Sequence, residues 1–274
     1  MKGTGKLLMA VCLIIFISSC QKEYSFDNGS GPTNPEATAF IDSSGITDTV
    51  QQDAIKNLVT QLKNDSLWAK FSAIYPIVGG TPASTKWNLK DPRDLDAAFR
   101  LTFYGSPIFS QGGILFSTIA DYANTHFVDN LLPYNSSSIA YYSTTQNSVS
   151  GYDMGCEDNS APYNEMAIYH SYDASDWFGY HSYGWTPANT VGLFMFSATV
   201  DNVKRYENGV AVDQKGSPPT NMYTNLPILL GKVANAAVSG QRQCSFAAIG
   251  QGLSDNEAWI FYNDVQNFEA QLGR

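Results

Sequence analysis

The chain has 274 residues, of which 43% are hydrophobic and 15% charged, and its formal net charge is −9. This length allows one main domain of about 200 residues with attachments. An acidic surface repels nucleic acid and anionic lipid headgroups, so the composition excludes both as partners and leaves sugars, proteins and metal cations.

Residues 1–20 have the pattern of a secretory signal. Lys2 and Lys6 precede an apolar run at 7–17, which is about half as long as a transmembrane helix. The Ser-Ser-Cys segment that ends at Cys20 resembles the bacterial lipoprotein box, which implies that residues 1–19 are removed and that Cys20 is acylated. The removed segment has two lysines and no acid, so the mature chain would have 14 basic and 25 acidic residues and a net charge of −11.

Residues 20–46 are rich in Ser, Gly, Pro, Asn and Thr and predict a flexible tether. Within it, Glu23 and Asp27 are similar to the export signal of Bacteroidota lipoproteins. This likeness implies an outer membrane lipoprotein that is exposed at the cell surface. A periplasm-facing lipoprotein is the alternative.

Residues 47–75 predict a helical extension. Thr47 or Asp48 can cap a helix, and apolar residues recur at helical spacing up to about Lys63. A second short helix is predicted over 67–74, before Pro76.

Residues 76–253 change to short β-rich runs separated by Gly, Pro, Asn and Ser. The pattern predicts an all-β, antiparallel jelly-roll β-sandwich. The predicted strands are 99–104, 113–118, 138–144, 166–172, 177–183, 191–200, 203–206, 210–212, 228–230 and 245–249.

Residues 254–274 predict a C-terminal helix that packs on the sandwich. Ser254 and Glu257 form a capping box, and Phe261, Val265 and Phe268 then lie on one stripe.

Three segments resemble the laminin-G-like, concanavalin A-like lectin and glucanase family. Residues 203–212 form two alternating runs around Asn208-Gly209, a pair typical of a type I′ hairpin turn, and resemble a hairpin of that family. Residues 227–232 and 246–257 resemble its next strand and its closing segment. The likeness implies the sandwich fold. The family's usual aspartate and arginine in the penultimate strand are replaced by Ala248 and Gln251.

The mature chain retains Cys156 and Cys244 in an oxidising compartment. They form either one disulfide or two buried free thiols, and the sequence leaves both open.

An aromatic concentration at 169–185 is the candidate ligand site. On the predicted strand 177–183, one face carries Trp177, His181 and Tyr183, with Asp173 and Asp176 in the adjacent turn. Aromatic rings suit stacking on the apolar face of a sugar, and the acids can bond its hydroxyls. The alternative is that about half of these rings fill the core.

Asp153, Glu157 and Asp158 form the one dense acidic group and are the candidate Ca²⁺ ligands. Ordinary surface acids are the alternative. The motifs of nucleophilic catalysis and of phosphate binding are absent from the sequence.

Fold cannot decide function within this class. The sequence favours a non-catalytic, lipid-tethered module that binds glycan, with no cofactor other than a possible Ca²⁺. A second hypothesis is a polysaccharide-degrading glycoside hydrolase or lyase that uses Asp153, Glu157 or Glu165. A third is an adhesion or structural lipoprotein that binds a surface protein.

Overall fold

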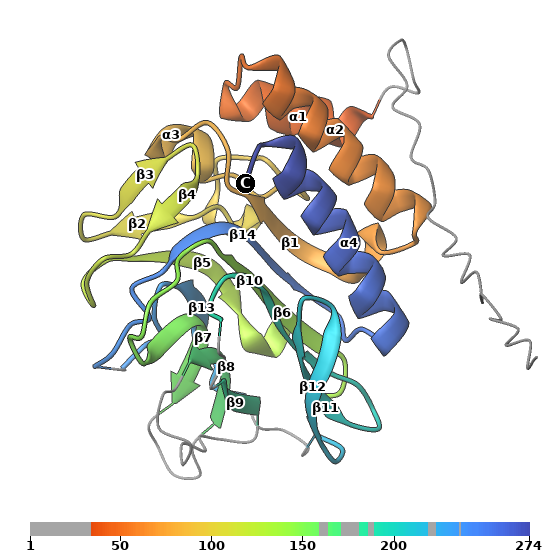
Figure 1. Ribbon diagram of the computed structural model, residues 1–274, viewed down its shortest axis with the longest axis vertical. Helices are drawn as coiled ribbons and strands as arrows, with labels where there is room; N and C mark the ends of the chain where they lie inside the picture. Colours follow the sequence, from red (N-terminus) through yellow and green to blue (C-terminus); the bar gives the residue numbers. More distant parts are fainter. Residues whose placement is uncertain (1–33, 159–163, 171–180, 186–188, 219–222, 236) are drawn as a thin grey trace, which may run out of the picture. The chain divides into compact units, whose positions relative to one another are not determined.

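A computed structural model describes residues 34–274, except 159–163, 171–180, 186–188, 219–222 and 236, and without the side chains of 181–185. Within these residues the chain forms two packed β-sheets and a helical layer (Figure 1). The predicted antiparallel β-sandwich with helices at both ends of the chain is confirmed.

The larger sheet has eight strands. Their order is β12 (Val210–Lys215), β11 (Val203–Glu207), β10 (Gly192–Ala198), β6 (Ser137–Ser143), β14 (Gln243–Gly250), β4 (Gly113–Leu115) and β3 (Ile108–Ser110), and β1 (Phe71–Pro76) also pairs with β14.

The smaller sheet has six strands. Their order is β2 (Thr102–Tyr104), β5 (Tyr122–Val128), β13 (Pro227–Leu230), β7 (Gly151–Asp158), β8 (Asn164–His170) and β9 (His181–Trp185). All pairings are antiparallel except that of β8 with β9.

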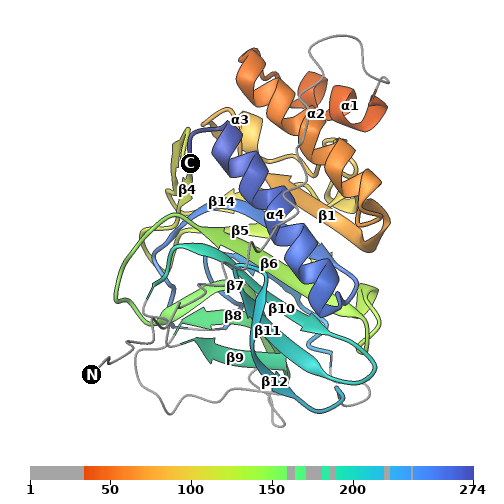
Figure 2. The same ribbon diagram turned by 45° about the vertical axis from the view of Figure 1, so that its right-hand side comes forward.

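Alternation along β14 shows how the layers are built. Ala247 and Ile249 belong to the core between the two sheets, whereas Phe246 and Ala248 belong to a second core beneath the helices. This second core joins the outer face of the eight-stranded sheet to α1 (Pro35–Ser44), α2 (Thr49–Asn64) and α4 (Asp255–Gln271). Figure 2 shows α4 lying across the strands of this sheet.

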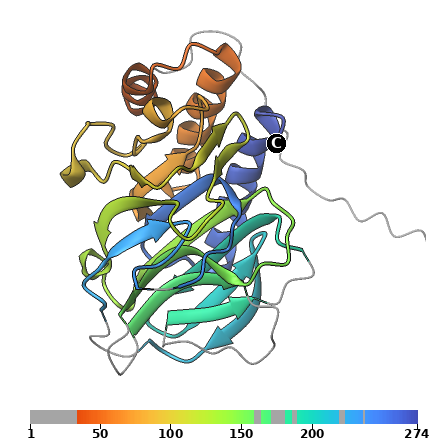
Figure 3. The same ribbon diagram turned by 90° about the vertical axis from the view of Figure 1, so that its left-hand side faces the viewer.

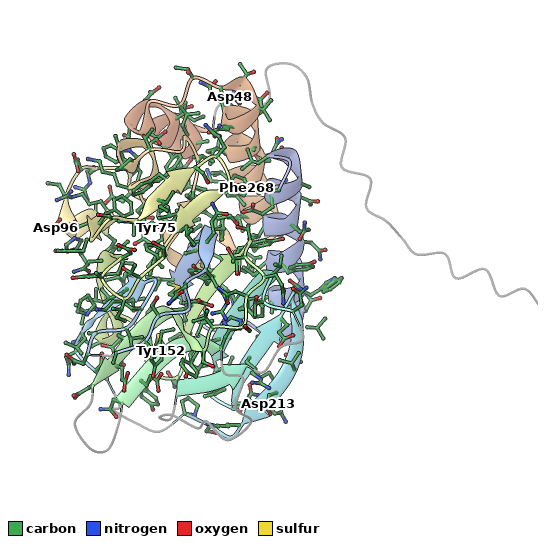
Figure 4. The ribbon with its side chains drawn as sticks, turned by 60° about the vertical axis from the view of Figure 1, so that its left-hand side comes forward. Asp48, Tyr75, Asp96, Tyr152, Asp213 and Phe268 are labelled. Carbon is green, nitrogen blue, oxygen red and sulfur yellow. The ribbon has the colours of Figure 1, made fainter. Side chains whose placement is uncertain are left out.

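The ribbon views place α1 and α2 at one end of the sandwich and β7, β8 and β9 at the other (Figures 1 and 3). Figure 4 labels Phe268 of α4 on the helical side and Tyr152 of β7 at the far end. Helices α1, α2 and α4 thus lie on the side of the eight-stranded sheet. The short helices are α3 (Pro82–Thr85), η1 (Trp68–Lys70), η2 (Asp96–Ala98) and η3 (Asp129–Leu131).

The elements with strong local signals are where the sequence predicts them. Asp48 caps α2, and the reciprocal bonds of Ser254 and Glu257 cap α4. Asn208 and Gly209 have φ of 50° and 77° in the turn between β11 and β12, as a type I′ hairpin requires.

The tether prediction is wrong for residues 35–44, which form α1. Asn34 caps this helix, Pro35 occupies its first turn, and Ala37 and Phe40 are buried against the α2 side of the helical core. The helical prediction for 71–74 is also wrong, because these residues belong to β1. Phe71 and Ile74 face the helices while Ala73 and Tyr75 face the sandwich, so burial on both sides removes the alternation typical of a strand.

The structure adds β3, β5 and β7 to the predicted strands. Of the described residues, no helix combines the length and the apolar character that crossing a membrane requires.

Candidate ligand-binding site at the loop end of the sandwich

A pocket of about 320 Å³ opens where three connections between strands meet. We call it the loop-end pocket. Its lining consists of residues 117–119 between β4 and β5, 149–150 between β6 and β7, and 237–239 with Gln241 between β13 and β14. Hydroxyl and amide side chains alternate there with apolar ones, and none of the described lining residues is charged.

Asp121 holds the first wall of the pocket. Its carboxylate accepts from the backbone N of Ser106 at 2.7 Å, from Ser117 Oγ at 3.0 Å, and from the backbone N and Oγ1 of Thr118 at 2.9 and 3.0 Å. Burial alone would raise the pKa of Asp121, but these four donors hold its pKa below the ordinary value. A charged Asp121 therefore orients the two hydroxyl residues that line the pocket.

Arg242 connects the other two walls of the pocket, which are residues 149–150 and 237–241. Its Nη2 donates to the carbonyl of Val149 at 2.6 Å, and its Nη1 lies 3.1 Å from Oδ1 of Asp153. Asp153 in turn contacts Nδ1 of His170 at 2.6 Å. All three side chains are at most 1% exposed. A Cβ at position 240 would overlap Asp153 and Arg242, so only Gly240 allows the chain to pass here.

The electrostatics of this buried cluster favour a charged Asp153. Burial would raise the pKa of Asp153, but His170 and Arg242 outweigh it and hold the pKa below its ordinary value. Burial lowers the pKa of His170 against the opposing effect of Asp153.

Two features make the pocket a candidate binding site. Ser239 is 4% exposed, and its Oγ has no hydrogen-bond partner among the described residues. Such an unsatisfied buried group is costly unless a ligand or water completes it. Gln241 has a φ of 52°, a left-handed conformation that is strained for a residue other than glycine and is common at functional sites.

An aromatic pair adjoins Asp121, which holds the first wall of the pocket. Tyr104 of β2 and Tyr122 of β5 are directly opposite each other, with ring centroids 4.6 Å apart and planes at 7°. Tyr122 follows Asp121 in the chain, so the pair adjoins the wall that Asp121 holds. The Tyr104 side chain is 41% exposed. A pocket lined by hydroxyls and bordered by an exposed ring can hold a sugar, whose hydroxyls bond the wall while its apolar face stacks on the ring.

The predicted ligand site at 173–183 falls largely outside the described residues. This applies to Asp173, Asp176 and Trp177. His181 and Tyr183 lie on β9, where their backbones pair with Met166 and Ile168. Their proposed contacts with a ligand stay a prediction.

The predicted Ca²⁺ ligands do not come together. Asp153 is inside the sandwich with His170 and Arg242, whereas Glu157 and Asp158 lie further along β7 and are half-buried. Across the part of the chain that the structure covers, no three His, Cys, Asp or Glu side chains gather as a metal site would need. The β-bulge between Tyr152 and Met154 turns Asp153 toward the interior, and the sequence gives no sign of it.

Of the two alternatives for the cysteines, the structure has the free thiols. Cys156 and Cys244 are free and fully buried. They lie on β7 and β14, which belong to different sheets. Facing sheets pack about 10 Å apart, whereas a disulfide requires Cα atoms within about 7 Å.

Glu157 and Glu165 pair directly across β7 and β8. Glu165 is buried, and burial raises the pKa of Glu157. Burial, together with the carboxylates of Glu165 and Glu157, raises the pKa of Tyr152. Tyr152, Tyr169, Ala167 and Val233 form a small apolar cluster beside them, separate from the main core.

Sequence reasoning missed the loop-end pocket and its aromatic pair. The pocket combines residues up to 124 positions apart, from 117 to 241, and only the strand order brings them together. The one local signal was Ser117-Thr118 three residues before Asp121, a pattern that favours a hydrogen-bonded turn.

The comparisons with known proteins identify no family. No family model matches the sequence, and no curated protein matches it. Among solved structures, the chain is similar to domain 4 of AbnA, a GH43 extracellular arabinanase from Geobacillus stearothermophilus in complex with arabinotriose. The TM-score is 0.45 and the identity 16%, over 70% of this chain and 98% of that one.

Two further structures are similar at the same level. The structure of botulinum neurotoxin type C, described with two ganglioside molecules, gives a TM-score of 0.46 and 13% identity over 73% of this chain and 52% of that chain. Trypanosoma rangeli sialidase gives a TM-score of 0.45 and 8% identity over 77% of this chain and 38% of that chain. The chain thus spans about half or less of these two proteins. Likenesses this loose leave the function to be argued from the chain's own residues.

Proposed function

We propose that this protein is a lipid-anchored cell-envelope lipoprotein whose β-sandwich binds glycan without catalysis. The sequence supports the anchor, since the apolar run at 7–17 ends in a box that resembles the acylation site at Cys20. The acids at 23 and 27 favour export to the cell surface. Cys20→Ala should abolish fatty-acid labelling and detergent partitioning, and undiminished label would refute the anchor.

The observation that carries glycan binding is the loop-end pocket with its bordering ring. Ser117, Thr118 and Ser239 line the pocket, and Tyr104 offers an exposed aromatic surface. A monosaccharide unit needs both kinds of contact, because its edge carries hydroxyls and its face carries C–H groups. Arg242 and Asp121 fix the walls in advance, which lowers the entropy cost of binding.

Ser239→Ala is the sharpest test. The Ser239 hydroxyl has no partner among the described residues, so its removal should leave the melting temperature unchanged or slightly raised. Binding on a glycan array, followed by titration, should weaken by about fivefold or more, as for loss of a hydrogen bond to a ligand. The mature chain from residue 20 with Cys20→Ser is the protein to use. Unchanged glycan affinity in Ser239→Ala would contradict the role of the pocket.

One observation favours a second function, a polysaccharide hydrolase or lyase. Residues directly opposite on antiparallel strands have Cβ atoms about 5 Å apart, so the pairing of Glu157 with Glu165 brings two carboxyls near the separation used by retaining glycosidases. Asp153 is excluded from this role because His170 and Arg242 bind it inside the sandwich. Release of reducing ends from polysaccharide, abolished by Glu157→Gln and by Glu165→Gln, would establish the enzyme and displace the non-catalytic proposal.

A further inference from the structure

The position of Lys232 indicates the charge of the ligand. Lys232 is the second residue of the connection between β13 and β14, which later lines the loop-end pocket. Its Nζ lies 4.7 Å from the centroid of the Tyr122 ring. The ammonium therefore stands beside the aromatic pair. The side chain is half-buried, which limits the orientations that it can take.

Lys232 differs from most lysines of the chain. Lys56, Lys63, Lys70, Lys86 and Lys204 each form an ion pair with an Asp or Glu. Within the described ranges, no carboxylate lies within ion-pair distance of Lys232. Lys90 also forms no ion pair, but its Nζ donates to the carbonyl of Trp68 at 2.6 Å.

Among the described residues that line the pocket, no unsatisfied acid competes with an anionic ligand. The described lining of the pocket has no charged residue. Asp121 is 3% exposed, and its oxygens already accept from Ser106, Ser117 and Thr118. An anion beside the Tyr122 ring would thus meet Lys232, and the described lining of the pocket adds no free carboxylate.

We infer that the glycan bound at the loop-end pocket is acidic, and that Lys232 binds its carboxylate or sulfate while Tyr104 stacks on the sugar ring. This inference rests on the proposed glycan binding. A lysine ammonium suits the role because it is a compact charge with three donors, which accepts either anion without the planar match that arginine requires.

Matched glycans separate the charge from the sugar. Oligogalacturonate and its methyl ester differ by the carboxylate alone, and dextran sulfate and dextran differ by the sulfate. The protein should bind at least one acidic member about tenfold more tightly than its neutral counterpart, as expected for a charge-assisted hydrogen bond. The pair that shows this preference identifies the anion. The preference should shrink as salt rises from about 50 to about 500 mM.

Variants assign the preference to Lys232. Lys232→Gln should reduce the preference for the acidic glycan to about twofold or less, and Lys232→Arg should retain most of this preference. Lys56→Gln, at an exposed position on α2, should leave the preference unchanged. Equal binding of both members of each pair, or a preference that survives Lys232→Gln, would overturn the inference. If neutral glycans still bound and Tyr104→Ala weakened them, the proposed function would stand while this inference failed. Absence of binding to any glycan would overturn both.

Discussion

Asp153 and Arg242 form an ion pair inside the sandwich, with Oδ1 and Nη1 3.1 Å apart and both side chains shielded from solvent. Asp153 lies on β7, while Arg242 directly precedes β14 in the other sheet. Because Arg242 also donates to the carbonyl of Val149, this pair connects both sheets to the wall of the loop-end pocket.

Arg242→Met should therefore destabilise the protein by about 3 to 5 kcal/mol, since it leaves the Asp153 carboxylate buried without its partner. Urea unfolding measures the change. The double variant Arg242→Met with Asp153→Leu should recover much of the loss, because it removes both charges. Arg93→Met, which removes an exposed ion pair with Asp91, is the control and should leave the stability nearly unchanged. An Arg242→Met variant as stable as the wild type would show that the pair contributes nothing.

The stability of the protein should fall as the pH drops below about 6.5, and His170 should carry part of that fall. Burial lowers the pKa of folded His170, so the unfolded chain binds more protons in this range and acid favours unfolding. Glu157 and Glu269 have raised pKa values and act in the opposite direction.

The difference in the pH dependence of the melting temperature between wild type and His170→Gln isolates the contribution of the histidine. Melting temperatures measured from pH 7 to pH 5 should decline less steeply in the variant. Asp153 stays charged throughout this range, because its pKa is held below 3.8. Parallel slopes for the two proteins would mean that His170 is protonated in the folded state as readily as in the unfolded one.

Cys156 and Cys244 should behave as inert thiols. Burial raises the pKa of both well above the ordinary value, so little thiolate is present to react. For the mature chain with Cys20→Ser, alkylation after denaturation without reductant should label two thiols, and alkylation of the folded protein should label none. Reductant should leave the melting temperature unchanged. A count of zero thiols in the denatured protein would restore the disulfide.

Phe40→Ala should destabilise the protein by about 3 to 5 kcal/mol, because Phe40 is 1% exposed in the helical core. Asp42→Ala, two residues along α1 and exposed, is the matched control. Equal unfolding free energies for the two variants would indicate that residues 35–44 are part of the tether after all.

The elements predicted correctly from the sequence are those that local chemistry determines. The capping box of Ser254 and Glu257, the Asp48 cap and the Asn208-Gly209 turn each act within a few residues. By contrast, β1 and α1 depend on distant partners. Phe71 and Ile74 are spaced as in a helix, and only pairing with β14 makes them a strand.

The candidate site was less accessible to sequence reasoning than the fold. The acids of 153–158 look like one group in the sequence, but they contact different residues in the structure. The bulge places Asp153 against Arg242, whereas Glu157 pairs with Glu165. Tyr104 and Tyr122 are 18 positions apart, and only the register of β2 and β5 stacks them. Strand pairing order, which short-range patterns do not encode, decided both.

Comparison of the glycan affinities of the variants Tyr104→Ala and Trp259→Ala tests the central claim, glycan binding at the loop-end pocket, most directly. Both rings are exposed, Tyr104 by 41% beside the loop-end pocket and Trp259 by 48% on α4. For the acidic glycan that binds best, isothermal titration should show a loss of about 1 to 3 kcal/mol for Tyr104→Ala and no change for Trp259→Ala. Full affinity in Tyr104→Ala, or a loss confined to Trp259→Ala, would contradict glycan binding at the loop-end pocket.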